Sequence, residues 1–247
     1  RGIEILHLNI GQPDIKSPVE SLNAVRETDL DLLKYEYSQG SLEFRKNLCN
    51  YYKKHSIHIS PDDIITTVGA SEALSFTMNS ICDPGEEVII PEPFYANYNG
   101  FALASDVNVI PITSKIEDNF ALPSIHEFEK KINGKTRAIL LCNPCNPTGY
   151  VYSQEEITNI ANLAKKNDLF IVVDEVYREF IYTDTKHFSI LEDEKFSENA
   201  ILIDSISKRY SLCGARVGFI VSKNSEFIDT CLKFALARLS PPTLALI

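Results

Sequence analysis

Seven short apolar runs rich in β-branched residues recur along the chain, and helical patterns separate most of them. The runs cover residues 64–68, 87–90, 107–112, 138–142, 169–173, 200–204 and 217–221. Several are apolar throughout, which is typical of strands that are covered on both faces of a sheet. This alternation predicts an α/β fold, a three-layer sandwich with a mostly parallel seven-stranded sheet.

Helical periodicity predicts helices near residues 41–55, 71–81, 94–104, 124–132 and 153–166. The last of these opens with Ser153, and Glu156 follows three residues later, which is the pattern of a capping box. Residues 1–30 do not join the alternation. We expect them to form an extended arm and a short helix that belong to another part of the protein.

Composition narrows the classes of function. The chain of 247 residues has 24 Lys and Arg against 34 Asp and Glu, a formal net charge of −10, which works against binding nucleic acid. No apolar run approaches the roughly 20 residues of a membrane span, and the start has no signal-peptide pattern. Six cysteines in a chain of this length are not a disulfide framework, which predicts a reducing, cytoplasmic location. Both ends look cut from a longer chain.

Ligands of such folds bind outside the carboxyl ends of the strands, so the residues that follow each run are the candidates for a site. Ala70 and Ser71 follow the first run and open a helix, where free amide groups and the helix dipole make an anion site. The alternative is an ordinary turn capped by a serine.

The segment 143–149 follows the fourth run and contains two Asn-Pro steps and a glycine, which hold an irregular backbone rigidly. A purely structural loop is the alternative. Cys142 and Cys145 have the spacing of a redox or zinc pair. No second cysteine pair or close histidine supplies further ligands, so we interpret this spacing as coincidence and expect no metal site.

Two further strand ends carry reactive groups. Asp174 ends a buried run, where a carboxylate is costly without a partner; a protonated heterocycle nitrogen would be one, and a turn cap is the alternative. Lys208 follows the sixth run and becomes a nucleophile if its pKa is lowered. Ser205 and Arg216 nearby suit a phosphate. A lone Ser-x-x-Lys means little, but all these candidates follow strands of one sheet.

Together, these residues resemble the fold-type-I pyridoxal-phosphate enzymes, specifically the class I/II aminotransferases related to aspartate aminotransferase. The resemblance covers residues 8–243. It implies that Lys208 forms the Schiff base with the cofactor aldehyde, and that Asp174 keeps the pyridine nitrogen protonated. With Lys208 released, its amine would move a proton between the substrate α-carbon and the cofactor.

The resemblance also assigns the remaining contacts. Tyr177 and Asn146 would hydrogen-bond the cofactor's ring oxygen, and Tyr95 would stack on the ring, where the family also uses Trp. Asn146 would contact the substrate as well. The phosphate would be held by four residues: Ala70, Ser71, Ser205 and Arg216.

Two implied contacts reach beyond the large domain. Tyr35, in a Tyr-x-x-x-x-Gly pattern with Gly40, would bind the phosphate of the neighbouring subunit in a homodimer. Gly11 would lie in the loop that passes over the substrate. Residues 1–30 would be the N-terminal arm of the small domain, and 31–247 the large cofactor domain. The family's principal arginine for the substrate carboxylate would lie beyond Ile247.

The function predicted is an aminotransferase that moves an amino group between an amino acid, aspartate-like or other, and a 2-oxo acid. Carbon–sulfur lyases and cyclopropane-forming synthases share Lys208 and Asp174 and remain alternatives. A non-enzymatic cofactor-sensing domain of a transcription regulator is another, although no helix-turn-helix module precedes the domain here. A generic nucleotide-binding protein lacks support, because neither G-x-G-x-x-G nor a Walker motif occurs.

Overall fold

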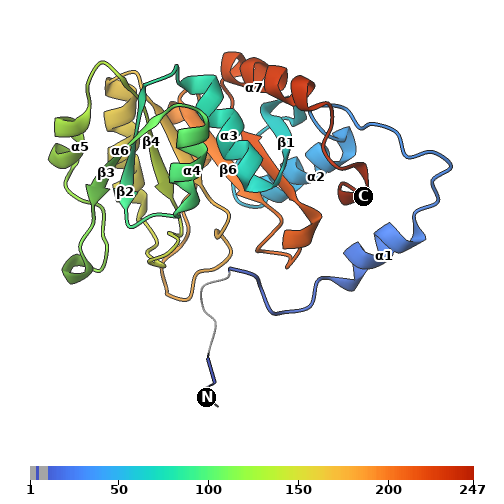
Figure 1. Cartoon of the computed structure of the whole chain (residues 1–247). Helices are drawn as coiled ribbons and strands as arrows, with labels where there is room; N and C mark the ends of the chain where they lie inside the picture. Colours follow the sequence, from blue (N-terminus) through green and yellow to red (C-terminus); the bar gives the residue numbers. More distant parts are fainter. Residues whose placement is uncertain (1–3, 6–10) are drawn as a thin grey trace.

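The computed structural model describes residues 4–5 and 11–247. Seven strands form one sheet in the order β1-β7-β6-β5-β4-β2-β3 (Figure 1). The strands are β1 (Ile64–Val68), β2 (Glu87–Glu92), β3 (Asn108–Thr113), β4 (Thr136–Cys142), β5 (Phe170–Asp174), β6 (Ala200–Ser205) and β7 (Val217–Val221). All pairings among β2 to β6 are parallel, whereas β7 runs antiparallel to both β1 and β6. The predicted mostly parallel seven-stranded sheet is confirmed.

All seven predicted strands are present, and their ends differ by at most two residues. The largest extensions are at β2, which continues to Glu92, and at β4, which begins at Thr136. Both follow from pairing, because Glu92 lies opposite Thr113 and Thr136 opposite Glu87. Polar residues at strand ends add hydrogen bonds to the ladder without adding to the apolar pattern.

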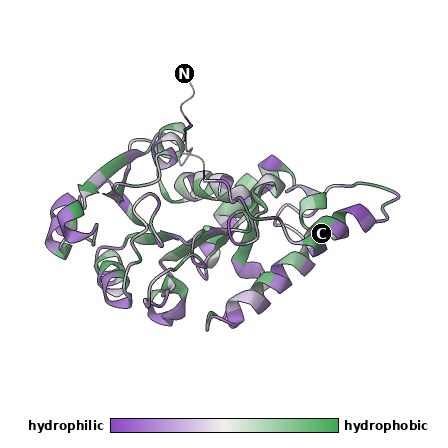
Figure 2. Cartoon of the chain, turned by 90° about the horizontal axis from the view of Figure 1, so that it is seen from below, coloured by the Kyte–Doolittle hydropathy of each residue, from purple (hydrophilic) through white to green (hydrophobic). Residues whose placement is uncertain are grey.

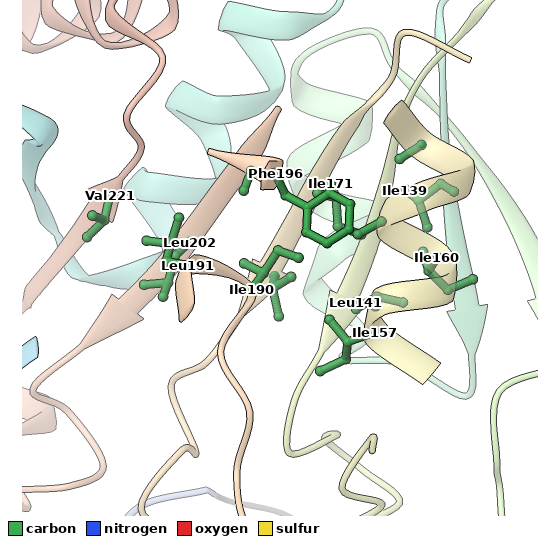
Figure 3. Packing of buried hydrophobic residues seen from close by; sticks show 14 of the residues in the cluster. Ile139, Leu141, Ile157, Ile160, Ile171, Ile190, Leu191, Phe196, Leu202 and Val221 are labelled. Carbon is green, nitrogen blue, oxygen red and sulfur yellow. The ribbon is translucent and has the colours of Figure 1, made fainter. Parts of the chain in front are cut away.

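Helices cover both faces of the sheet. One face carries α2 (Leu42–Lys53), α5 (Ile125–Lys131) and α6 (Gln154–Lys166), and the other carries α3 (Gly69–Ile81), α4 (Asn97–Ala104) and α7 (Ser225–Arg238). Successive strand residues serve opposite faces: Ile171 packs with the α6 side and Val172 with the α3 side. Figure 3 shows the first of these cores, in which Ile157 and Ile160 of α6 lie over the strands.

The helix ends follow recognisable local chemistry. Ser153 caps α6 through its hydroxyl, and the Glu156 carboxylate accepts a hydrogen bond from the Ser153 amide at 2.8 Å, as the capping box predicted. Helix α7 was not predicted, although Asn224 caps it and Phe227 opens a buried stripe along it. Within the described residues there are also six short 3-10 helices: η1 (Pro61–Asp63), η2 (Ile116–Asp118), η3 (Ile190–Glu192), η4 (Glu194–Phe196), η5 (Cys213–Ala215) and η6 (Thr243–Ala245).

The N-terminal segment adds no strand to the sheet, and the Ser17 hydroxyl joins it to the Ser211 carbonyl oxygen at 2.6 Å. Its short helix, α1 (Val19–Glu27), buries none of its residues, and an irregular stretch joins it to α2 (Figure 1). Residues 1–3 and 6–10 of the predicted arm lie outside the described residues. The strands are mostly apolar and the helices around them mixed (Figure 2). Within the described parts of the chain, no helix combines the length and the apolar character that crossing a membrane requires.

Candidate active site

The carboxyl ends of β4, β5 and β6 open into a cavity of about 560 Å³. In Figure 1 the N-terminal segment passes beneath these strand ends. The cavity gathers ten of the eleven predicted site residues: Gly11, Ala70, Ser71, Tyr95, Asn146, Asp174, Tyr177, Ser205, Lys208 and Arg216. Tyr35 is the exception. It lies on the irregular stretch before α2 with 76% of its surface exposed and does not line the cavity.

One end of the cavity is built for an anion. Ala70 and Ser71 lie in the first turn of α3, and Arg216 precedes β7 in a left-handed conformation (φ 57°). A Cβ on Gly69 would lie 2.2 Å from Nη2 of Arg216, so only glycine lets the guanidinium come this close. A Cβ on Gly218 would lie 2.3 Å from the carbonyl carbon of Gly69 and 2.5 Å from the Ala70 amide nitrogen. These two glycines bring β7 and its arginine against the helix N-terminus.

Asp174 is buried at the end of β5, on the α4 side of the sheet. Its Oδ2 accepts a hydrogen bond of 2.7 Å from the Tyr98 hydroxyl, and its Oδ1 accepts one of 3.2 Å from the Val176 amide. Burial raises the pKa of Asp174 to about 6, although both hydrogen bonds act to lower it. A cationic group beside Asp174 in the cavity would stabilise the ionised carboxylate and so offset the effect of burial on its pKa.

The amine of Lys208 faces the cavity from the turn after β6. Its Nζ donates a hydrogen bond to the Gly11 carbonyl oxygen, so the N-terminal segment lies directly over it. A Cβ built on Gly11 would be 3.4 Å from the Tyr177 hydroxyl and 3.7 Å from Nζ. Burial, with the nearby Cys142 and Asp174, raises the pKa of Tyr177 above its ordinary value, which keeps the phenol protonated as a hydrogen-bond donor.

Aromatic side chains also line the cavity, among them Phe94, Tyr95 and Tyr98. The Tyr95 ring packs edge-on against Tyr98, with centroids 5.5 Å apart, and its hydroxyl accepts a hydrogen bond from Asn97. The predicted helix 94–104 begins only at Asn97, which leaves Tyr95 on the turn that faces the cavity. The backbone amide of Asn146 donates to Sγ of Cys142 at 3.4 Å, and both residues line the cavity.

Sequence reasoning missed several lining residues, of which Tyr98 matters most because it bonds Asp174. The sequence has no local signal for this contact, because it depends on where α4 packs. Cys142 also lines the cavity, and Cys145 is buried beside it. Among the described residues, no three or more His, Cys, Asp or Glu side chains gather in a way that would hold a metal ion.

Comparisons with known proteins match this chain to aminotransferases. The family model for "Aminotransferase class I and II" matches residues 3–246. The aspartate aminotransferase of Pyrococcus abyssi is 31% identical over 242 residues, which cover 97% of this chain and 62% of that protein. The putative aminotransferase YugH of Bacillus subtilis is 36% identical over 250 residues, 98% of this chain and 63% of that one.

Solved structures agree. The aspartate aminotransferase of Thermotoga maritima superposes with a TM-score of 0.93 at 31% identity, over 99% of this chain and 65% of that one. The aromatic aminotransferase of Pyrococcus horikoshii superposes with a TM-score of 0.90 at 31% identity, over 96% of this chain and 64% of that one. The chain spans less than two thirds of the length of these relatives. A match that runs through every strand and through the whole cavity makes this chain a member of the aminotransferase class I and II family.

Proposed function

We propose that the chain is the cofactor-binding part of a pyridoxal-phosphate-dependent aminotransferase, which exchanges an amino group between an amino acid and a 2-oxo acid. The observation that carries the proposal is that one cavity is lined by four kinds of group: the first turn of α3 with Arg216, an aromatic ring, a buried carboxyl and a lysine amine. Pyridoxal phosphate has a complementary group for each of them: a phosphate, a flat ring, a ring nitrogen and an aldehyde.

The residues present fit this cofactor. The close approach at Gly69 and Gly218 leaves the α3 amide groups and the Arg216 guanidinium as donors for a phosphate. The Tyr95 ring would stack on the cofactor ring. Asp174 is buried and, among the residues that the structure describes, has no cation as a hydrogen-bond partner, which suits a protonated ring nitrogen. The hydroxyl of Tyr177 and the amide of Asn146 would donate to the ring oxygen.

Each of these residues has a task in the exchange. The bound cofactor supplies an electron-withdrawing ring that stabilises negative charge at the substrate α-carbon. Asp174 holds the proton on the ring nitrogen and so maintains that withdrawal. Lys208 is positioned to act as the base that moves a proton at the α-carbon. Arg216 and Ser205 keep the phosphate end fixed while the other end reacts.

The substrates and the assembly are also proposals. Relatives named aspartate and aromatic aminotransferases support amino acids and 2-oxo acids as substrates. The exposed Tyr35 supports a homodimer in which it reaches the partner's phosphate site, and Gly11 over Lys208 supports a loop that covers the substrate. The lone helix α1 supports residues 1–30 as part of a small domain and 31–247 as the large one. Six unpaired cysteines support a cytoplasmic location.

Cofactor trapping tests the proposal. The purified chain mixed with pyridoxal phosphate should become yellow, and borohydride should fix the cofactor to the peptide that contains Lys208. Lys223, partly exposed and away from the cavity, serves as the internal control. Labelling of another lysine in place of Lys208 would refute the assignment.

Amino exchange then separates the aminotransferase from the lyases on the same fold. An aminotransferase moves the amino group of glutamate or aspartate to an added 2-oxo acid, so the donor becomes a 2-oxo acid and the acceptor becomes an amino acid. A carbon–sulfur lyase releases pyruvate and ammonia instead, and a cofactor-sensing domain turns over neither substrate.

A further inference from the structure

A cluster of charged and phenolic side chains is buried behind the turn that carries Lys208. It consists of Tyr51, Tyr52, Glu175, Arg178, Asp204 and Arg209, and we call it the buried charge cluster. Asp204 alternates with Ser205 along β6 and faces α2, whose Tyr52 hydroxyl bonds it. The Glu175 carboxylate lies 3.8 Å from Arg178 and 3.8 Å from His187. None of the six lines the cavity. Direct contact with a substrate is therefore not their role.

One carboxylate of this cluster holds both ends of the Lys208 turn. Oδ1 of Asp204 accepts a hydrogen bond of 2.7 Å from the Ser205 amide, at the start of the turn. Its Oδ2 accepts a charge-assisted hydrogen bond from Nη2 of Arg209, directly after Lys208. Within the turn, the Ser207 amide donates to the Ser205 hydroxyl at 3.1 Å. Lys208 thus lies in a short segment fixed on both sides.

Further contacts hold the two charges in place. The Tyr52 hydroxyl donates to Oδ2 of Asp204 at 2.7 Å. The Arg209 guanidinium lies 4.5 Å from the centre of the Tyr51 ring, a cation–π contact. Burial works against the charge of Arg209, but Asp204 and the two tyrosines outweigh it and raise the pKa of the guanidinium. The pair is charged and almost completely enclosed, with 3% and 0% of the two side chains exposed.

A buried ion pair is an expensive way to obtain stability, since well-packed apolar residues often serve as well or better. Its distinctive property is direction, because the planar guanidinium fixes the angle at which it meets a carboxylate. We propose that Arg209 is a positioning residue: its buried bond to Asp204 turns the backbone so that the Lys208 amine faces the cavity. The proposal rests on the proposed role of Lys208.

A positioning role and a merely structural role predict different results. If the ion pair only stabilised the fold, its loss would lower the unfolding free energy but leave Lys208 equally reactive in protein that is still folded. If it positions Lys208, the amine samples more orientations in the folded protein without it, and misorientation alone costs rate. The reactivity of Lys208 in folded protein therefore separates the two.

The experiment compares Arg209→Gln, Arg209→Lys and the double variant Asp204→Asn/Arg209→Gln with the unchanged chain. The double variant leaves no unpaired buried charge and so recovers stability. Two rates are measured in folded protein by peptide mass spectrometry. The first is the acylation of Lys208 by an amine-reactive acylating reagent in the absence of cofactor, and the second is the borohydride trapping of pyridoxal phosphate on Lys208. Binding of pyridoxamine phosphate, which cannot bond to the lysine, reports the phosphate site separately.

We expect trapping on Lys208 to fall roughly tenfold or more in Arg209→Gln and to stay low in the double variant, with pyridoxamine phosphate affinity changed less than about threefold. Arg209→Lys should recover part of the rate, because lysine keeps the positive charge but lacks the planar guanidinium group. Arg178→Gln is the matched control. Arg178 is equally buried and also lies over the Tyr51 and Tyr52 rings, but its carboxylate neighbour is Glu175, and we expect no effect on Lys208.

Three outcomes would overturn the proposal: unchanged Lys208 rates in the double variant, recovery of those rates in proportion to stability, or an equal loss in Arg178→Gln. If Arg209→Gln does not fold, the double variant and Arg209→Lys decide by the same criteria. Failure of the proposed function looks different, because the unchanged chain would then not trap the cofactor. The acylation rates would still report whether Arg209 orients the amine.

Discussion

The hydroxyl of Tyr98 donates a hydrogen bond of 2.7 Å to Oδ2 of Asp174, and both side chains are buried. This bond favours the ionised carboxylate against a burial that raises its pKa to about 6. Tyr98 therefore determines the pH at which the carboxylate becomes available to pair with a cationic ring nitrogen.

Tyr98→Phe should raise the pKa of Asp174 further. A hydrogen bond to a charged group contributes about 1.5–3 kcal/mol, which corresponds to roughly one to two pH units. Cofactor affinity of the variant, measured by absorbance titration, should fall on the order of tenfold at pH 6.5 and change little at pH 8.5. Tyr150→Phe is the control, because it removes a tyrosine–carboxylate bond to Glu156 outside the cavity. The same loss at both pH values would contradict the role given to Tyr98.

Asp174→Asn should keep cofactor binding but lose most of the amino exchange. Asparagine has nearly the same shape and still accepts a hydrogen bond from Tyr98, but it cannot keep a ring nitrogen protonated. Loss of one preorganised charge contact commonly raises the barrier by several kcal/mol, so turnover should fall on the order of a hundredfold or more. Asp229→Asn, at an exposed position on α7, should leave turnover unchanged. Near wild-type exchange in Asp174→Asn would refute the assignment.

Gly218→Ala should damage the anion end of the cavity. The new methyl group would lie 2.3 Å from the carbonyl carbon of Gly69, and backbone atoms cannot swing aside as a flexible side chain does. We expect a loss of about 1–3 kcal/mol in unfolding free energy, measured by denaturant titration, together with weaker binding of pyridoxamine phosphate. Gly100→Ala in α4, where a Cβ meets nothing within 4 Å, should be neutral or stabilising. Equal effects of the two substitutions would argue against the close approach.

His187 should make the fold sensitive to acid. Its Nε2 lies 3.3 Å from the Asn143 carbonyl oxygen and 3.8 Å from Oε2 of Glu175, and burial lowers its pKa to about 4. Between pH 6.5 and 4, His187 is protonated in the unfolded chain but stays neutral in the folded chain. Stability is therefore lost as the pH falls through this window, by about 3 kcal/mol for this group alone.

The measurement is the unfolding free energy at several pH values for the unchanged chain and for His187→Gln. Glu175, whose pKa burial raises to about 7, contributes a slope of the opposite sign, so the comparison uses the difference between the two proteins. That difference should shrink as the pH falls from 6.5 to 4. His126→Gln, at an exposed histidine, should show no such trend. A difference independent of pH would mean that His187 is charged in the folded protein.

Mixing Tyr35→Phe subunits with Lys208→Ala subunits tests the proposed homodimer. If Tyr35 serves the partner's cavity, a heterodimer carries both defects in one cavity and leaves the other intact. A random mixture should then recover about a quarter of the unchanged activity, since half of the dimers are mixed and each has one good site. Absence of recovery, with heterodimers confirmed by native mass spectrometry, would place Tyr35 in its own subunit's site or in none.

The apolar runs predict where the strands lie, because burial on both faces leaves a pattern that depends on no other segment. They do not predict strand direction: nothing in the five apolar residues of β7 distinguishes an antiparallel strand from a parallel one. Helix α7 carries both a capping asparagine and a buried stripe, so a more thorough search for helical spacing would have found it.

Most cavity residues could be predicted because they lie at the ends of strands, and the strand ends of one sheet converge, whereas Gly11 was predicted only from the family resemblance. Tyr98 and the buried charge cluster could not be predicted in the same way. The bond between Tyr98 and Asp174 depends on where α4 packs, and the bond between Tyr52 and Asp204 depends on where α2 packs. Such contacts join residues far apart in sequence, and no local pattern marks them.

Strand β7 lies between β1 and β6 in the sheet, although it comes last of the seven strands in the sequence. During synthesis on the ribosome, β1 and the first turn of α3 therefore emerge before β7, the strand that packs against them. Domains gain their contacts as the chain emerges, and pairings between distant segments form late. A nascent chain in which β2 to β6 have already paired still has no place for a phosphate until Arg216 and Gly218 arrive. The proposed phosphate site is therefore completed only when the last of the seven strands is in place.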